Sequence, residues 1–268
     1  MAFSFSNKIA LITGGASGIG KLMGRELLQR GAELIIWDIN EKHLAETVHE
    51  FSSLGKVTGY KVDVTRIDDI RESAALVKKE NGPVDLLINN AGIIVGKLFH
   101  EHSIEDITRT MDINALAPMH IVREFLPDMM ERNSGHICNI ASLAGLVSNY
   151  RMAAYVASKF SLTGFSDSLR IEMKLLRRNI GITTVMPYYI STGMFSGVSS
   201  VLPILKPEKV AYKIIRAIEN NRTHLGMPWP FHLIRFLQGI LPIGVFDWFM
   251  GKVFRIYSSM DQFKGRAD

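Results

Sequence analysis

The chain has 268 residues, of which 47% are hydrophobic and 21% charged, so intrinsic disorder is excluded and one large α/β domain fits. The net charge of +5 is spread along the chain rather than grouped, which gives no indication of nucleic-acid binding. The single cysteine, Cys138, excludes an internal disulfide, and no apolar run reaches the roughly 18 residues of a membrane span.

Short apolar runs alternate with longer stretches of helical spacing along the chain. Each run closes on Gly, Asp, Asn or Pro, as strands buried on both faces do. This alternation predicts a single doubly wound α/β domain over residues 1–268, with a parallel sheet of about seven strands and helices on both faces. The predicted strands are residues 8–13, 33–38, 58–63, 84–89, 136–141, 182–187 and 223–227. The predicted helices include residues 20–30, 40–51, 114–132, 155–178 and 207–220.

The first predicted strand runs directly into a glycine-rich turn, residues 14–20, and a helical stretch follows. Glycines let a phosphate approach the backbone closely, and the amide groups at a helix start can bind it. The sequence therefore predicts a Rossmann-type dinucleotide site, with a plain structural turn as the alternative. The predicted cofactor contacts in this turn are Gly14, Ser17, Gly18, Ile19 and Gly20.

An acidic residue, Asp38, ends the second predicted strand, 18 residues beyond Gly20. A carboxylate at this position can accept hydrogen bonds from both hydroxyls of the adenosine ribose, and it would repel a 2′-phosphate. Ser17 and Ile39 offer no guanidinium to hold such a phosphate. The sequence therefore predicts NAD rather than NADP as the cofactor. The alternative role for Asp38 is to cap the following helix.

Tyr155 and Lys159 are four residues apart, so they share one face of a helix. A lysine ammonium beside a tyrosine stabilises the phenolate and lowers the phenol's pKa, which is about 10 in water. Tyr155 would then serve as an acid or base near neutral pH. Ser142 closes an apolar strand and could donate a hydrogen bond to a carbonyl oxygen. Such a pair alone is usually helix surface, but together with a dinucleotide turn it indicates catalysis.

Six segments match one known family in order and spacing: residues 13–20 (TGGASGIG), 63–64 (DV), 89–92 (NNAG), Asn114, Ser142 and residues 155–159 (YVASK). In these segments the chain resembles the short-chain dehydrogenase/reductase family, and the resemblance extends over nearly its whole length. The family resemblance implies the Rossmann fold and hydride transfer with a nicotinamide cofactor.

The resemblance also implies a role for each matching residue. Tyr155 would exchange a proton with the substrate oxygen, and Ser142 would hold that oxygen. Lys159 would bind the nicotinamide ribose and keep the Tyr155 pKa low, while Asn114 would position a water that links Lys159 to solvent. The further implied cofactor contacts are Asp63 and Val64 at the adenine, Asn89, Ala91 and Gly92 at the ribose, and Pro187, Ile190 and Thr192 near the nicotinamide. Asp63 as a strand cap and residues 89–92 as a plain turn are the alternatives.

One segment departs from the family pattern, which usually has Pro-Gly after the sixth strand. Here Tyr188 follows Pro187, so an aromatic ring replaces the usual glycine near the substrate. Residues 187–195 (PYYISTGMF), 37–40 (WDIN), 129–133 (MMERN) and 259–263 (SMDQF) resemble a narrower branch. That branch contains enzymes similar to epidermal retinol dehydrogenase and 17β-hydroxysteroid dehydrogenase types 11 and 13.

Residues 193–205 are apolar and uncharged and contain glycine, which is typical of a mobile lid over an apolar substrate; a loop that packs on the core is the alternative. The loop after Ser142 adds Leu143, Leu146, Val147 and Tyr150. We therefore expect hydride transfer between NAD and a secondary or allylic alcohol or carbonyl of a sterol, retinoid or long-chain lipid. The alternatives are a biosynthetic 3-keto lipid or acyl ketoreductase and a cofactor-binding lipid-surface protein without turnover.

The C-terminal extension, residues 228–268, begins with an apolar, aromatic-rich stretch that Gly and Pro interrupt and that Arg235, Lys252 and Arg255 flank. This pattern predicts a segment that contacts a membrane surface or covers the substrate cleft; burial against the sheet or a partner subunit is the alternative. We expect a cytoplasmic protein, at most peripheral at a membrane, with no metal site and no nucleic-acid partner. The family resemblance implies a homodimer or homotetramer that pairs helices 114–132 and 155–178.

Overall fold

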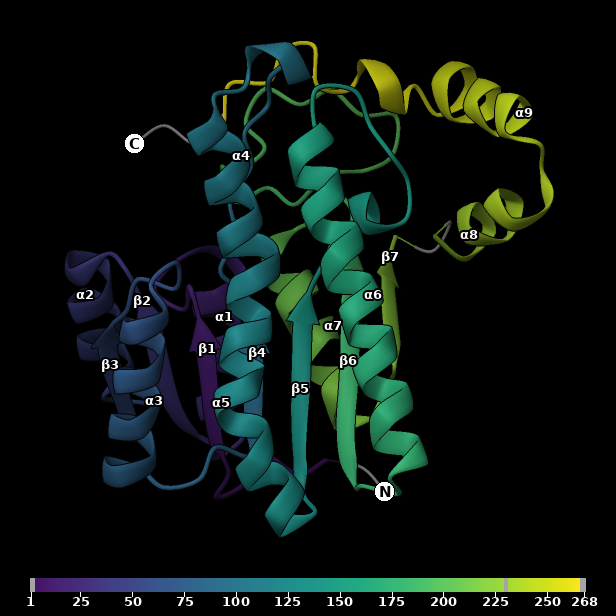
Figure 1. Cartoon of the computed structure of the whole chain (residues 1–268). Helices are drawn as coiled ribbons and strands as arrows, with labels where there is room; N and C mark the ends of the chain where they lie inside the picture. The colour runs from purple at the N-terminus through teal and green to yellow at the C-terminus, as the bar shows by residue number, and fades with distance from the viewer. Residues whose placement is uncertain (1–2, 229–230, 266–268) are drawn as a thin grey trace.

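The computed structural model describes residues 3–228 and 231–265, and within them one parallel sheet has the strand order β3-β2-β1-β4-β5-β6-β7 (Figure 1). The order reverses between β1 and β4, so the carboxyl ends of these two strands flank the crevice in which a doubly wound fold binds its ligand. The strands are β1 (Ile9–Thr13), β2 (Glu33–Asp38), β3 (Val57–Lys61), β4 (Leu86–Asn89), β5 (Gly135–Ile140), β6 (Ile180–Pro187) and β7 (His224–Met227).

All seven predicted strands are present, each with ends within two residues of the predicted ones. Their apolar runs identify them because the central strands are covered on both faces; every residue of β4 and of β5 is buried. The prediction of a doubly wound parallel sheet is confirmed.

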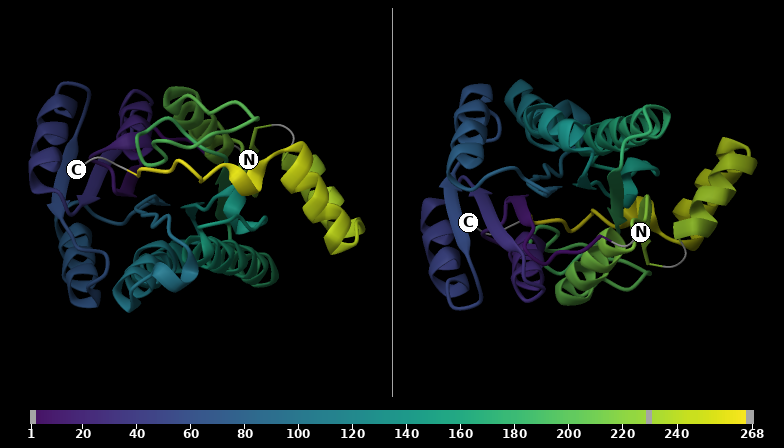
Figure 2. Two further views of the ribbon diagram at one scale, coloured as in Figure 1. Left: turned by 90° about the horizontal axis from the view of Figure 1, so that it is seen from above. Right: turned by 90° about the horizontal axis from the view of Figure 1, so that it is seen from below.

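Helices cover both faces of the sheet, as the two end-on views in Figure 2 show. Apolar residues of α1, α2 and α7 pack on one face, and those of α3, α5 and α6 pack on the other. These helices are α1 (Gly18–Leu28), α2 (Glu41–Phe51), α3 (Ile67–Glu80), α5 (Ala117–Arg132), α6 (Ala153–Leu175) and α7 (Pro207–Glu219). Exposed apolar side chains on and beside α5 and α6 include Leu116, Phe160 and Ile171. The pairing of these helices with a second subunit stays a prediction.

The shorter elements gather near the carboxyl ends of the strands (Figure 1). They are η1 (Phe99–Glu101), α4 (Ile104–Met111), the π-helical turn η2 (Asp112–Leu116), η3 (Leu143–Gly145), α8 (Phe231–Ile240), α9 (Ile243–Trp248), the π-helical turn η4 (Phe249–Val253) and η5 (Ile256–Ser258). Residues 229–230 and 266–268 of the C-terminal extension lie outside the described residues. Nowhere in the described ranges is a helix both long enough and apolar enough to cross a membrane.

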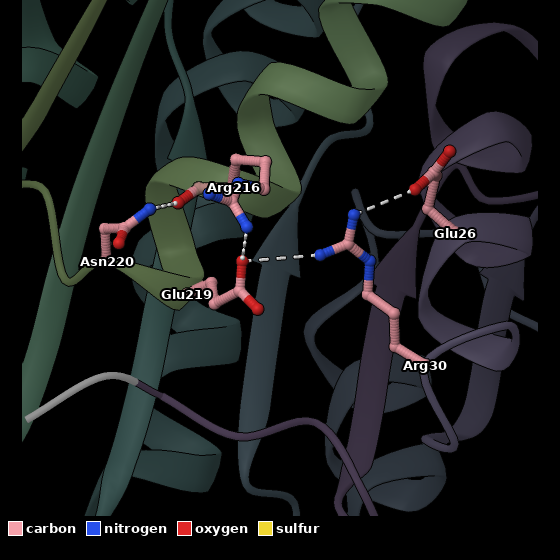
Figure 3. Close-up of polar contacts among 5 residues, drawn as sticks. All are labelled: Glu26, Arg30, Arg216, Glu219 and Asn220. Carbon is pink, nitrogen blue, oxygen red and sulfur yellow. Dashed lines mark hydrogen bonds and ion pairs between the residues drawn. The ribbon is translucent and has the colours of Figure 1, made fainter.

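An ion-pair network joins α1 to α7 (Figure 3). Arg30, just after α1, lies 3.1 Å from Glu26 and 3.5 Å from Glu219, and Glu219 also pairs with Arg216 at 2.9 Å. The Arg30 guanidinium further lies over the Tyr212 ring, 5.7 Å from its centroid. Arg30 therefore holds two helices of the same layer together by charge and by ring contact.

Replacing Arg30 by Gln should lower the free energy of unfolding by about 1 kcal/mol, because two partly exposed ion pairs and the cation–π contacts with Tyr212 and Phe5 are lost. Urea unfolding followed by circular dichroism measures the change. Arg66→Gln is the matched control: among the described residues, Arg66 forms its ion pair with Asp69 alone, at the exposed start of α3. Equal losses in the two variants would show that the α1–α7 network adds nothing specific.

Candidate active site

Two cavities lie at the carboxyl ends of β1, β2 and β4, beside the glycine-rich turn. The larger, of about 680 Å³, is called the large cavity, and the next, of about 150 Å³, the middle cavity. Gly14, Ser17, Ala91 and Gly92 line both, so the two cavities are continuous. An elongated ligand can therefore extend from the end of β2 to the end of β5.

The glycine-rich turn separates these cavities from the sheet. Gly14 and Gly18 have φ of +62° and +54°, a backbone region that other residues rarely adopt. Ser17, Gly18 and Ile19 line the middle cavity. Gly20 does not line either cavity; a Cβ there would collide with the Gly14 carbonyl oxygen, so this glycine lets α1 pack against the turn.

Asp38 lies at the end of β2 and lines the large cavity. Its carboxylate accepts the amide N–H groups of Ala16 and Asn40, each at 3.0 Å, so it is held beside the glycine-rich turn. The alternative role of capping α2 belongs to Asn40, whose Oδ1 accepts the His43 N–H at 2.9 Å. Glu105, Arg109 and Asp112 line the far wall of the same cavity, and sequence reasoning missed them.

Asp63 and Val64 line the large cavity, and their contact with the adenine stays a prediction. Asp63 also accepts the Thr65 N–H at 3.0 Å and the Thr65 hydroxyl at 2.7 Å, so it stabilises the turn after β3 as well. The cavity role and the capping role of this carboxylate therefore coexist.

Asn89 does not have the place that was expected for it. Its side chain is buried and donates to Asn139 Oδ1 at 2.8 Å, and it lines neither cavity. The next residue, Asn90, lines the middle cavity and donates to the carbonyl oxygens of Thr13 and Gly14, each at 3.0 Å. Because β4 ends at Asn89, its side chain still follows the alternation of the strand and points into the core.

Ser142, Tyr155 and Lys159 together line the middle cavity. Tyr155 and Lys159 lie in the first two turns of α6, and Lys159 Nζ lies 5.7 Å from the centroid of the Tyr155 ring. The Lys159 ammonium donates to the Ile140 carbonyl oxygen at 2.9 Å. The Ser142 hydroxyl donates to the Pro187 carbonyl oxygen at 3.5 Å and lies close enough to the Tyr155 hydroxyl to lower its pKa. Two hydroxyls and one amine therefore converge beside the end of β5.

The direction of the Tyr155 pKa shift differs from the expected one. Burial raises the pKa of Tyr155 to about 12, and the nearby Ser142 hydroxyl opposes this rise by less. Burial also lowers the pKa of Lys159 to about 8. The expectation that Lys159 holds the Tyr155 pKa below its usual value is therefore wrong for the protein alone. Excluding water from the phenolate outweighs the attraction of an ammonium that is itself desolvated.

Asn114 lies in the π-helical turn η2 between α4 and α5, where a continuous helix was predicted to start. Its amide group accepts the Ile93 N–H and donates to the Ile93 carbonyl oxygen, both at 2.9 Å. It also donates to the Ser158 hydroxyl at 3.1 Å, which ties the turn to α6. A side chain at Gly92 would contact both Asn114 Oδ1 and Lys159 Nζ, so the glycine leaves that space open. The water-positioning role of Asn114 stays a prediction.

Pro187, Ile190 and Thr192 line the middle cavity from the segment after β6. A third cavity of about 30 Å³, called the small cavity, continues beyond Ser142. The middle and the small cavity share three lining residues, Ser142, Tyr188 and Phe195. The other residues that line the small cavity are Leu143, Ala144, Val147, Asn149, Met152, Tyr189 and Ile256. Of the four loop residues predicted here, Leu143 and Val147 line it, whereas Leu146 and Tyr150 do not.

A polar group at the small cavity ties the C-terminal extension to the core. The Tyr189 and Ser259 hydroxyls are 2.8 Å apart, and Asn149 Nδ2 donates to both, at 2.9 and 3.1 Å. Backbone bonds continue this tie, from Ser199 N–H to Ser259 and from Lys264 N–H to Ser196. Figure 2 shows this strap, residues 259–264, crossing the carboxyl ends of the strands. Sequence reasoning expected a cover here but had no signal for these partners.

A family model described as short chain dehydrogenase matches residues 8–201. The chain belongs to the short-chain dehydrogenase family. It is 39% identical to short-chain dehydrogenase/reductase family 16C member 6 of Bos taurus, over 88% of this chain and 77% of that protein. It is also 39% identical to epidermal retinol dehydrogenase 2 of Mus musculus, over 89% and 79%. Estradiol 17-beta-dehydrogenase 11 of Macaca fascicularis is 35% identical, over 89% and 81%. These relatives confirm the resemblance to the narrower branch.

Solved structures of other short-chain dehydrogenases share the fold. One from Burkholderia phymatum in complex with NAD has a TM-score of 0.82 at 27% identity, covering 88% of this chain and 95% of that one. A metagenomic short-chain oxidoreductase in complex with NADP has a TM-score of 0.70 at 26% identity, covering 84% and 96%. This short-chain dehydrogenase is therefore an oxidoreductase that uses NAD or NADP.

The residues of this short-chain dehydrogenase fit a dinucleotide. The first turn of α1 contains no acidic residue, and the side chain of its N-cap, Ser17, makes no capping bond within the described residues. The amide groups there remain available to a pyrophosphate. The large cavity offers the Asp38 carboxylate to a ribose, and the middle cavity offers the Lys159 amine.

Proposed function

We propose that the protein transfers hydride between NAD and a secondary or allylic alcohol or ketone of an apolar molecule, such as a sterol, retinoid or long-chain lipid. The observation that carries this proposal is the lining of the small cavity, which is mainly aliphatic and aromatic and begins at the catalytic Ser142. None of the residues that line this cavity is Asp, Glu, Lys or Arg. Relatives named for retinol and estradiol support the same substrate class.

The side chains that converge on the middle cavity divide the chemistry among them. Ser142 donates a hydrogen bond to the substrate oxygen, and Tyr155 exchanges a proton with that oxygen. With a pKa of about 8, Lys159 carries its charge at neutral pH and can donate to a ribose hydroxyl. The nicotinamide, when bound, accepts or supplies the hydride, and its oxidised form brings a positive charge that favours the phenolate.

The protonation state of Tyr155 has different consequences for carbonyl reduction and for alcohol oxidation. A phenol with a pKa of about 12 is neutral at pH 7, so it is ready to donate a proton to a carbonyl oxygen. In the alcohol-oxidising direction the same group must lose a proton, which requires nearby positive charge. Lys159 is the cation that this chain places beside it.

The substrate class is tested with purified protein and NAD against sterols, retinol and long-chain alcohols, with reduced cofactor followed by its absorbance. We expect turnover with at least one of these apolar alcohols and none with short hydrophilic alcohols. Turnover restricted to hydrophilic alcohols would contradict the proposal. Higher activity with NADPH than with NADH would favour the ketoreductase alternative and would contradict the role given to Asp38.

Replacing Asp38 by Asn should reduce the preference for NAD over NADP, measured as the ratio of kcat/KM values, by about tenfold or more. The substitution removes the charge that repels a 2′-phosphate and weakens the charge-assisted bonds to ribose hydroxyls, each worth about 1.5–3 kcal/mol. Glu105→Gln is the control, because Glu105 lines the large cavity from the opposite wall. An unchanged ratio in Asp38→Asn, or an equal change in the control, would remove Asp38 as the selecting group.

A further inference from the structure

We propose that α8, α9 and η4 form a docking face for an anionic lipid surface. The docking face consists of seven large apolar side chains that are exposed to solvent: Leu233, Phe236, Ile240, Ile243, Val245, Trp248 and Val253. Ile243 is 81% exposed, Phe236 62% and Trp248 56%. Seven large apolar side chains exposed on one short segment mark a surface that another apolar phase covers. The proposal rests on this surface and is independent of the hydride-transfer reaction.

Helix α8 has two apolar sides, one of which packs on the rest of the protein while the other is exposed to solvent. Ile234, Leu237 and Leu241 follow helical spacing and pack on the cluster that contains Tyr155 and Tyr188. Leu233, Phe236 and Ile240 follow the same spacing on the neighbouring side and are exposed. Since the inward side already anchors the helix, the outward apolar side is not needed for folding. The inward side fits the expectation of burial for this extension, and the outward side is the one that we assign to the lipid surface.

The charge of the segment favours anionic lipid over a second copy of the chain. Arg235, Lys252 and Arg255 are all exposed, and the segment 231–258 contains a single acidic residue, Asp247. Asp247 accepts a hydrogen bond from the Tyr257 hydroxyl at 2.6 Å. Three cations against one anion give the segment a net charge of +2, so a symmetric contact would bring like charges together. Anionic headgroups attract the same cations while the apolar side chains enter the acyl boundary.

The place of the docking face in the fold also suits a lipid surface. Helices α8 and α9 stand away from the body in all three views, beyond β7 (Figures 1 and 2). They lie beside the small cavity, because Gln238 of α8 donates to the Leu146 carbonyl oxygen at 2.7 Å and Ile256, just after η4, lines that cavity. A lipid surface on this face would therefore lie next to the cavity wall. An exposed tryptophan such as Trp248 is typical of segments that sit at a membrane interface.

Vesicle co-sedimentation of the full-length protein tests the proposal. We expect binding to vesicles of phosphatidylcholine and phosphatidylserine mixed at about 7:3, and binding at least about tenfold weaker to phosphatidylcholine alone. The double variant Ile240→Glu/Ile243→Glu should lower affinity for the mixed vesicles by about tenfold or more, since two charges would enter the apolar layer. Both positions are exposed, so circular dichroism should show an unchanged fold.

The matched control is Leu175→Glu/Leu176→Glu. These residues are 76% and 58% exposed, close to the 81% and 59% of Ile243 and Ile240. They form the C-terminal end of α6, which lies at the other end of the sheet from α9 (Figure 1). The control should bind vesicles as the unmodified protein does. Equal loss in both double variants would mean that general surface hydrophobicity is responsible, and would overturn the proposal.

Tryptophan fluorescence and molecular mass give two independent readouts. In a Trp229→Phe background, which leaves Trp37 and Trp248, binding to the mixed vesicles should shift the emission to shorter wavelength. Adding Trp248→Phe should remove most of that shift, because Trp37 is fully buried. Absence of vesicle binding by the unmodified protein would overturn the proposal. So would a fall in oligomer mass caused by Ile240→Glu/Ile243→Glu, since the face would then be a subunit contact. Neither readout requires turnover, so failure of the proposed function leaves this test unaffected.

Discussion

Replacing Tyr155 by Phe should lower kcat by about a hundredfold or more while cofactor affinity stays nearly unchanged, as proton transfer by a positioned side chain contributes about 10²–10⁴. The substitution removes only the hydroxyl that lines the middle cavity beside Ser142, and the ring keeps its edge contact with Phe195. The cofactor-binding residues of the large and middle cavities are untouched. Steady-state kinetics gives kcat, and quenching of protein fluorescence gives the cofactor Kd.

Tyr188→Phe is the matched control for this experiment. Tyr188 lines the same middle cavity, but its hydroxyl accepts a hydrogen bond from Ser200 at 2.9 Å. We expect this variant to keep most of its turnover. A Tyr155→Phe enzyme with normal kcat, or a Tyr188→Phe enzyme that loses as much, would contradict the catalytic assignment.

Replacing Lys159 by Met should abolish most turnover and yet stabilise the cofactor-free protein. Burial lowers the pKa of Lys159 from 10.5 to about 8, so holding its charge at pH 7 costs roughly 3 kcal/mol of folding free energy. Loss of the hydrogen bond to the Ile140 carbonyl oxygen should offset only about 1 kcal/mol of the stability gained by removing this charge. Denaturant unfolding should therefore show a more stable variant, and kinetics a nearly inactive one.

The pH dependence of the stability difference between Lys159→Met and the unmodified protein distinguishes removal of a buried charge from a simple gain of apolar contact. Between the folded pKa of about 8 and the unfolded value of 10.5, the unfolded chain holds a proton on Lys159 that the folded protein has lost. Stability of the unmodified protein therefore rises with pH in this window, and its deficit relative to Lys159→Met should shrink between about pH 7 and 9.5. A deficit that stays constant over this range would contradict the buried-charge explanation.

Lys78→Met serves as the control for the lysine experiment. Lys78 pairs with Asp128 at 3.0 Å at a partly exposed position, so its removal should give no comparable gain in stability. A similar gain in both variants would show that methionine itself, rather than the loss of a buried charge, stabilises the fold.

The sequence predicted most of the sheet because strands covered on both faces must be apolar throughout. The run before Gly14 and the run before Ser142 are examples, since β1 and β5 are almost entirely buried. The convergence of Ser142, Tyr155 and Lys159 on the middle cavity was predictable for a related reason: these residues lie at a strand end or one helical turn apart, where spacing along the chain fixes proximity. Asn89 was assigned wrongly because a difference of one residue at a strand end reverses the side chain's direction.

The remaining features depend on contacts between distant parts of the chain. The π-helical turn at Asn114 leaves no mark on apolar periodicity, because it is stabilised by the loop that contains Ile93. The hydrogen bond between Tyr189 and Ser259 joins residues 70 positions apart. The raised Tyr155 pKa reflects complete burial, which the spacing to Lys159 does not reveal. Packing, rather than local pattern, determines each of these.

The strap of residues 259–264 has a consequence for how such proteins diverge. Its partners, among them Asn149, Tyr189 and Ser196, all lie outside the strands of the sheet. Substitutions among these residues can change the shape of the small cavity without altering the large cavity beside the glycine-rich turn. A lineage could thus acquire a new substrate while inheriting its redox machinery unchanged.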